Sequence, residues 1–183
     1  MLPKELQFTY ADYKDFPEDG KRYEILEGRL LMIPSPFTPH QRVSGNLYVC
    51  LSNHVKSKNL GVVFHPPYDV VLSEINVVQP DIIYVSKENS RIITEANIKG
   101  TPDLLIEIVS KTSKKNDEIT KKMIYAQSSV KEYWIVYPES KEIKVYVESE
   151  KGYILWKKFS NNDTVSTPAL PNLNLNLAEM FVL

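Results

Sequence analysis

The stretch Leu104–Val109 reads LLIEIV, a run of branched aliphatic residues with one acid inside it. A continuous apolar run of this kind is typical of a central strand that is covered on both faces. It predicts such a strand over residues 103–110. Burying an unpaired carboxylate costs several kcal/mol. Glu107 is therefore expected to be paired, protonated or bound to a metal ion.

A second acid interrupts another apolar run upstream. Residues 77–85 read VVQPDIIYV and predict a strand, with an edge or a bulge at Pro80 and with Asp81 directly after it. Two acids on two apolar strands suit Mg²⁺, which takes one or two carboxylates and keeps water as its other ligands. Two alternatives stay open: Asp81 ends a turn after Pro80, or Glu107 forms an ion pair with an internal lysine.

A triplet of polar residues follows the Glu107 strand after a short loop. Asp117, Lys121 and Tyr125 are spaced at i, i+4 and i+8, which places them on one face of a helix. From there the tip of Lys121 can reach back toward the two acids, where it can orient or deprotonate an attacking water molecule. The alternative is an exposed helix face that carries an ordinary Asp117–Lys121 ion pair.

The remaining helices are predicted from caps and from apolar residues at helical spacing. We expect helices at residues 9–16, with Thr9 as the cap, at 40–56, and from a cap at 113 or 116 to about 128. In the last of these, Ile119, Met123 and Ala126 are expected on the inner face.

The remaining strands are predicted from turns and apolar runs. We expect a hairpin over 22–33 that turns at Glu27-Gly28, strands near 62–65 and 68–72, and a meander of 131–137, 142–148 and 153–159. The tail from Pro168 alternates Leu and Asn, which predicts an extended covering strand. Together the elements predict an α/β fold, a mixed β-sheet flanked by helices, in a single domain over residues 1–183.

Composition narrows the possible function classes. The 183 residues carry a net charge of −1, so any binding of nucleic acid must depend on a local patch. Basic residues gather beside the proposed site. They can bind a phosphate backbone, or they are simply solvent-exposed residues at the start of a helix. These residues are Lys111, Lys114, Lys115, Lys121 and Lys122. The single cysteine, the absence of a signal peptide and the absence of an apolar membrane span favour a cytoplasmic protein.

The motifs described so far resemble those of the PD-(D/E)XK nuclease superfamily, and within it a large bacterial family of restriction endonucleases of unassigned specificity. The resemblance runs from Arg22–Gly28 (RYEILEG) to Glu132–Val136 (EYWIV). Its most specific parts are Val78–Asp81 (VQPD), Pro102–Ser110 (PDLLIEIVS) and the helical triplet. It implies a restriction-endonuclease-like fold, Mg²⁺- or Mn²⁺-dependent cleavage of nucleic acid with DNA as the expected substrate, and Asp81 and Glu107 as the metal ligands.

The sequence departs from the superfamily motif at one position. The motif has a lysine two residues after the second acid, where this chain has Val109. The resemblance makes Lys121 the replacement, while Lys122 lies about 100° around the helix and should point elsewhere. Glu24 also matches a family position, as a further ligand or a supporting group; the alternative is a hairpin residue balanced by Arg22.

The predicted catalytic residues are thus Asp81, Glu107 and Lys121. Asp117 is expected to orient the lysine and Tyr125 to support the pair. His40 either contacts phosphate or substrate, or is a capping or exposed histidine. A homodimer is expected because both strands of a duplex must be cut. Two alternatives remain: a nuclease-fold module that binds without cutting, which the Val109 departure favours, and a glycosidase with paired acids and no metal ion.

Overall fold

The structure is a computed structural model that describes residues 6–17 and 19–182. The elements of the first half are α1 (Tyr10–Lys14), β1 (Arg22–Leu26), β2 (Arg29–Ile33), α2 (Thr38–Ser57), β3 (Gly61–Phe64), β4 (Val70–Ser73), β5 (Asn76–Val78), β6 (Ile82–Ser86) and the 3₁₀ helix η1 (Lys87–Ile92). Those of the second half are β7 (Ile98–Lys99), β8 (Leu104–Ile108), the π-helical segment η2 (Asn116–Lys121), α3 (Lys122–Gln127), β9 (Glu132–Tyr137), β10 (Glu142–Ser149), β11 (Gly152–Ser160), β12 (Thr164–Val165), β13 (Leu175–Asn176) and α4 (Leu177–Met180).

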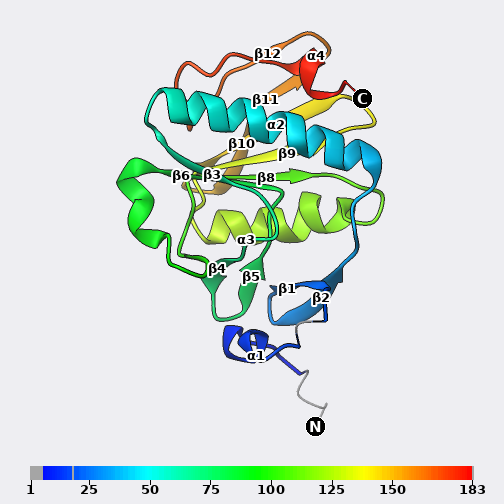
Figure 1. The fold of residues 1–183 in the computed structure, drawn as a ribbon, viewed down its shortest axis with the longest axis vertical. Helices are drawn as coiled ribbons and strands as arrows, with labels where there is room; N and C mark the ends of the chain where they lie inside the picture. Colours follow the sequence, from blue (N-terminus) through cyan, green and yellow to red (C-terminus); the bar gives the residue numbers. More distant parts are fainter. Residues whose placement is uncertain (1–5, 18, 183) are drawn as a thin grey trace.

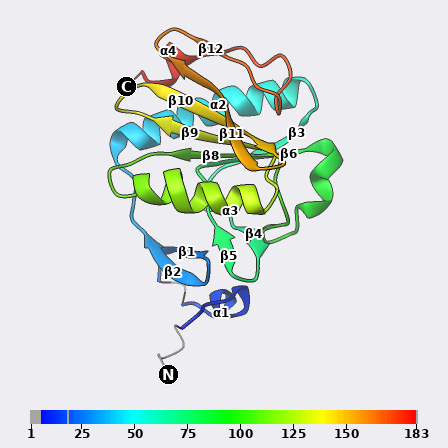
Figure 2. The ribbon, with the colours of Figure 1, turned by 180° about the vertical axis from the view of Figure 1, so that it is seen from behind.

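A six-stranded sheet forms the centre of the molecule, in the order β11-β10-β9-β8-β6-β3. Strand β8 runs parallel to β9 and antiparallel to β6, so the sheet is mixed. All five residues of β8 are buried, as expected for a central strand. Helix α2 covers one face of this sheet and α3 covers the other (Figures 1 and 2). The predicted mixed α/β architecture is confirmed.

Alternation along β8 decides which side chains face which helix. Leu104, Ile106 and Ile108 belong to the core cluster that contains the buried residues of α2. Leu105 belongs to the other cluster, with Ile124 and Tyr125 of α3. Because side chains alternate between the two faces of a strand, Glu107 shares the face of Leu105. The acid therefore points toward the segment that carries Lys121.

A smaller five-stranded sheet lies below the first in Figure 1, in the order β2-β1-β5-β4-β7. Strands β1 and β2 form the predicted hairpin, and its turn residues Glu27 and Gly28 both have positive φ angles, of 53° and 77°. This conformation suits a two-residue turn whose twist matches that of the strands. The hairpin carries Glu24 toward the larger sheet.

Two predictions about local structure are wrong. Residues 77–85 are two strands in different sheets, because the chain passes from β5 to β6 through Pro80, which has no N–H to donate to a ladder. The helix of residues 113–128 is π-helical in its first part, and Ile119 and Met123 are 60% and 41% exposed. Its buried inner side instead carries Asp117 and Lys121, and apolar periodicity could not reveal a polar inner face.

Most of the other predicted elements agree with the structure, and the tail agrees only in part. Thr9 caps α1, α2 spans the expected helix, and β9, β10 and β11 form the meander. In the tail the leucines of the Leu/Asn alternation are buried, but only two residues pair as a strand before α4 begins. No helix among the residues that the structure describes has the length and apolar character needed to cross a membrane.

Candidate active site

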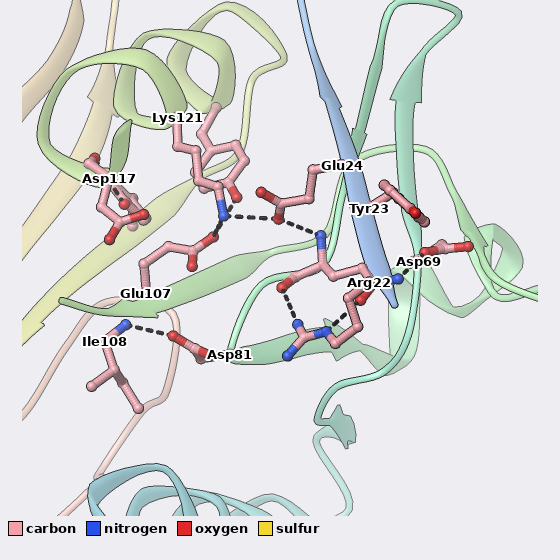
Figure 3. Close-up of polar contacts among 12 residues, drawn as sticks. Arg22, Tyr23, Glu24, Asp69, Asp81, Glu107, Ile108, Asp117 and Lys121 are labelled. Carbon is pink, nitrogen blue, oxygen red and sulfur yellow. Dashed lines mark hydrogen bonds and ion pairs between the residues drawn. The ribbon is translucent and has the colours of Figure 1, made fainter. Parts of the chain in front are cut away.

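Segments from both sheets and from two helices meet at the carboxyl end of β8. Strand β1 supplies Glu24, the link between β5 and β6 supplies Asp81, β8 supplies Glu107, and η2 supplies Asp117 and Lys121 (Figure 3). Together these side chains line a cleft of about 240 Å³, to which the start of α2 adds His40. The cleft therefore collects most of the residues that the sequence predicted as functional.

Lys121 is the centre of this cluster. Its side chain is buried, and Nζ donates to Oε1 of Glu24 at 2.8 Å and to Oε1 of Glu107 at 3.0 Å (Figure 3). An ammonium group has three N–H donors, so these two bonds leave one donor for a further partner. The structure thus places the lysine against the acids, the position expected of a replacement for the one missing at Val109. Its catalytic role stays a prediction.

Glu107 is held by two donors on a single oxygen. Besides Lys121, the hydroxyl of Tyr125 donates to Oε1 at 2.6 Å. None of the hydrogen bonds described for the molecule reaches Oε2 of Glu107, so that oxygen is available to another ligand. The i+4 spacing of Lys121 and Tyr125 brings both donors to the same carboxylate. Glu107 thus has the internal lysine partner that the sequence left open as an alternative.

Asp81 is fixed by a backbone donor from the neighbouring strand. Its Oδ2 accepts from N–H of Ile108 at 2.8 Å and contacts Nε2 of His40 at 3.1 Å. Because Ile108 directly follows Glu107, this bond anchors Asp81 next to the second acid. A carboxylate only accepts hydrogen bonds, so Nε2 of His40 carries the proton. Nδ1 of His40 is buried and has no partner among the described residues.

The electrostatics of the cleft are dominated by acids. Four carboxylates line it against two permanent cations, Arg22 and Lys121. Burial, followed by the negative charges of Asp117, Asp81 and Glu24, raises the pKa of Glu107 well above its usual value despite the opposing effect of Lys121. With all four acids ionised, the described lining of the cleft has an excess of two negative charges, which one divalent cation would neutralise.

The pKa values of Lys121 and Asp117 follow from the same cluster. Burial acts to lower the pKa of Lys121, but Glu107, Glu24 and Asp117 together raise it above its ordinary value, so the lysine stays protonated. Burial raises the pKa of Asp117 to about 6, although Lys121 opposes this shift.

Asp117 does not hold Lys121 in the way expected from the sequence. The hydrogen bonds that the structure describes for Lys121 go to Glu24 and Glu107, and Oδ2 of Asp117 is buried with no partner among the described residues. Glu24, from a hairpin about a hundred residues away, takes the orienting position instead. The spacing rule on a helix face detects neighbours on that helix only, so it favoured Asp117.

Two residues of the site were missed as functional candidates. The Arg22 guanidinium donates through Nε to Oε1 of Gln79 at 2.8 Å, and the Gln79 backbone N–H donates to Oε1 of Glu24 at 2.8 Å. Arg22 therefore does not balance Glu24 by a direct ion pair. A signal was present, since Arg22 lies two residues before Glu24 on one strand and so shares its face, and Gln79 directly precedes Pro80-Asp81.

The basic stretch does not converge on the acids. Lys111, Lys114 and Lys115 are exposed. Lys122 lies with Nζ 3.9 Å from the centroid of the Tyr146 ring, away from the cleft as expected. Only Lys121 of this group enters the site.

The donor set fits a hard cation that keeps most of its water ligands. Across the described part of the chain, no three His, Cys, Asp or Glu side chains form a ready metal cage. A zinc site needs three or four such ligands, whereas Mg²⁺ is commonly held by one or two carboxylates with water completing the octahedron. Asp81 and Glu107 could supply that smaller number of hard oxygen ligands.

The fold is that of a restriction-endonuclease-like α/β protein. The chain belongs to the Uma2 family, because the family model described as "Putative restriction endonuclease" matches residues 10–178. This match confirms the resemblance read from the sequence motifs. It supports a nuclease function for the chain.

One solved structure shows the same fold over almost the whole chain. The protein is similar to the crystal structure of "a putative nuclease belonging to DUF820" from Anabaena variabilis, with 18% identity and a TM-score of 0.79. The alignment covers 95% of this chain and 97% of that one. No curated protein shows significant similarity to the chain.

Proposed function

We propose that the chain is a Mg²⁺-dependent nuclease that hydrolyses phosphodiester bonds in nucleic acid, with DNA as the substrate. The observation that carries this proposal is the contact of a protonated, buried lysine with Glu107 in a cleft where carboxylates outnumber cations. An acidic cleft repels a phosphate until a cation neutralises it. We therefore expect substrate binding and cleavage to require a divalent ion, Mg²⁺ or Mn²⁺.

Asp81 and Glu107 would hold this ion. When bound, Mg²⁺ lowers the pKa of a water ligand and stabilises negative charge on the scissile phosphate. Asp81 is kept in place by the N–H of Ile108 and by His40, and Glu107 by Lys121 and Tyr125. Oδ1 of Asp81 and Oε2 of Glu107 are the oxygens that these contacts leave free.

Lys121 would act as a charged donor and not as a general base. Its raised pKa keeps the amine protonated at neutral pH, so it has no lone pair with which to remove a proton. Its remaining N–H can orient the attacking water or donate to the charge that develops on the phosphate, which is the electrostatic form of catalysis. Glu24 keeps Nζ in this position.

The alternatives are less well supported by the geometry. The non-cutting module was favoured by the loss of the motif lysine at Val109, and Lys121 now occupies the space beside Glu107. A glycosidase needs two carboxyl groups in separate acid and nucleophile roles and has no use for a lysine bound to one of them. Neither alternative accounts for the excess of acids around a single lysine.

The test is a cleavage assay on plasmid DNA with the purified chain in EDTA, in Mg²⁺ and in Mn²⁺, with single-stranded DNA and RNA alongside. We expect cleavage with the divalent ions only, and loss of cleavage in Asp81→Asn and Glu107→Gln. Lys122→Ala is the matched control and should cleave normally, because Lys122 packs on Tyr146. Metal-independent cleavage, or DNA binding without cleavage in either ion, would contradict the proposal. Sedimentation of the same sample tests the expected homodimer.

A further inference from the structure

A second hollow of about 520 Å³ adjoins the acidic cleft. Four residues line both spaces: Arg22, Pro36, His40 and Asp81. The rest of its wall comes from α2 and from the turn after β3, and consists of Gln41, Ser44, Gly45, Tyr48, His65, Pro66 and Pro67. A chain-like ligand that has one unit at the acids can therefore place its next unit in this hollow.

Arg22, at the boundary of the two spaces, carries a charge that no described carboxylate neutralises. Its contacts are with neutral acceptors, Oε1 of Gln79 at 2.8 Å and the Gln79 carbonyl at 3.4 Å. A guanidinium has five N–H donors in a planar fork, so most of them are available. Lys121, by contrast, is paired with two acids. Of these two cations, Arg22 is thus the one whose charge is not paired with a described carboxylate.

The second hollow differs from the cleft in its chemistry. Among the described residues of its wall, Asp81 at the boundary is the one acid. The rings of Tyr48 and His65 meet edge to face with centroids 4.7 Å apart, and they offer aromatic surface to a planar group. Gln41 and Ser44, on the same helix, provide amide and hydroxyl groups. Aromatic rings beside a guanidinium are the usual means of holding a base and its phosphate.

We propose that this hollow is the subsite for the nucleotide next to the scissile phosphate. Arg22 binds the phosphate of that nucleotide, and Tyr48 and His65 contact its base. The proposal rests on the proposed nuclease function and adds the residues that position the substrate. Since every base has a flat face, contact with the rings favours no particular base, whereas Gln41 and Ser44 reach the polar edges that differ between bases.

Gly45 allows the hollow to be filled without disturbing the protein. It lies in α2 among the lining residues, and a Cβ added there meets no atom within 4 Å. Leucine also favours a helix more than glycine does. Gly45→Leu should therefore fold normally, with a melting temperature equal to or above that of the wild type, while its side chain takes the place of the ligand.

The experiment titrates deoxynucleoside 5′-monophosphates into the wild-type protein with Mg²⁺ and follows the ring signals of Tyr48 and His65 by NMR. These probes contain no phosphodiester bond, so the ion can be present without turnover. We expect saturable shifts in the wild type and in Gly45→Ala. We expect affinity to fall at least tenfold in Gly45→Leu. Asn53→Leu, which adds the same side chain to an exposed position of α2, should bind normally.

Arg22→Gln separates the phosphate contact from the base contact. This variant should lose affinity for the nucleotide and keep the weaker affinity for the nucleoside, while inorganic phosphate alone should compete in the wild type only. The subsite is overturned if Gly45→Leu binds like the wild type, or if the shifts map away from Tyr48 and His65, or if the wild type shows no saturable shift.

Cleavage measured on the same samples distinguishes the two proposals. If the wild type cleaves DNA and Gly45→Leu does so with an unchanged KM, the subsite is wrong and the nuclease function stands. If nucleotides bind at Tyr48 and His65 but neither Mg²⁺ nor Mn²⁺ supports cleavage, the subsite stands and the nuclease function is wrong.

Discussion

The ammonium group of Lys121 lies 3.0 Å from Oε1 of Glu107, although the two residues are 14 positions apart and belong to a helical segment and a strand. The same ammonium is shared with Glu24 at 2.8 Å. One cation therefore holds two buried carboxylates together across three elements. This arrangement makes the lysine important to the folded state as well as to any chemistry.

The first prediction concerns the stability of Lys121→Met. This change leaves Glu24 and Glu107 buried without their cation, and breaking a buried pair in this way costs roughly 3–5 kcal/mol. The pKa of Glu107 is already raised by burial and will rise further without the lysine. An acid whose pKa is higher in the folded state than in the unfolded state binds more protons when the protein is folded. The folded state therefore gains stability as the pH falls through the folded-state pKa of that acid.

We therefore expect Lys121→Met to have a lower free energy of unfolding than the wild type. The difference should be largest near pH 8 and should shrink toward pH 5. Urea unfolding of both proteins across this range measures it. Lys122→Met is the control, because this neighbouring lysine contacts the Tyr146 ring and no buried acid. A deficit that does not change with pH would show that unpaired carboxylates are not its cause.

The second prediction concerns the turnover of the same variant. Lys121 is expected to serve as a preorganised donor, and loss of one such donor reduces kcat by about 10²–10³-fold. Rates are compared at a temperature where Lys121→Met is folded, as shown by circular dichroism. Lys122→Met should retain normal turnover. Equal rates for Lys121→Met and the wild type would remove the lysine from the mechanism.

Much of this fold could be predicted from the sequence because local patterns determine it. The apolar run at Leu104–Ile108 and the apolar positions of α2 at every fourth residue were sufficient to predict the central strand and its covering helix. The candidate acids stood out for the same reason, since Asp81 and Glu107 interrupt apolar segments. A charge in an apolar segment is informative because its burial must be compensated.

The parts that could not be predicted depend on contacts between distant residues. Arg22 and Gln79 are 57 positions apart and are brought together by the pairing of β1 with β5. Nothing near Arg22 in the sequence indicates that its partner is a neutral amide. The inner face of the helix around Asp117 was predicted wrongly, because the prediction from apolar periodicity assumes that apolar residues face the core. At this site polar residues do so.

The third prediction tests the metal ligand on β8. Glu107→Gln keeps the oxygen that accepts from Lys121 and Tyr125 and removes the charge, so we expect the fold to persist. Loss of a supporting residue typically lowers metal affinity 10–100-fold, so loss of a direct ligand should lower Mg²⁺ affinity by more than about 100-fold. Calorimetric titration with Mg²⁺ measures this.

Glu132→Gln is the matched control for that titration. Glu132 is an equally buried glutamate on the adjacent strand, but it accepts from Trp134 and from N–H of Ala169 and does not line the cleft. It should bind Mg²⁺ like the wild type. If both variants lose affinity to the same extent, the effect comes from a general loss of stability and not from a ligand.

The fourth prediction concerns His40, which holds Asp81 through Nε2. His40→Ala should free the Asp81 side chain and lower Mg²⁺ affinity by about 10–100-fold, the usual effect of removing a group that orients a ligand. His54→Ala is the control, because His54 lies on the same helix and contacts the carbonyl of Pro171 instead. Unchanged affinity in His40→Ala would show that the Ile108 N–H alone fixes Asp81.

The fifth prediction concerns Asp117, whose carboxyl group is buried and has one oxygen without a partner in the described part of the chain. Burial raises its pKa from the usual 3.8 to about 6. The folded state therefore binds more protons than the unfolded state between these two values, and stability falls as the pH rises through them. Each pKa unit corresponds to about 1.4 kcal/mol, so ionising Asp117 costs the folded state up to about 3 kcal/mol.

Asp117→Asn removes this cost, because the amide has nearly the same shape and does not ionise. Without divalent ions, the variant should match the wild type near pH 4 and exceed its unfolding free energy by up to about 3 kcal/mol near pH 8. Urea unfolding at several pH values measures both curves, with Glu95→Gln as a control at an exposed acid. Parallel curves for Asp117→Asn and the wild type would mean that Asp117 ionises in the cleft without cost. Burial would then not destabilise the ionised carboxylate, and a cation bound in the cleft would relieve no cost at Asp117.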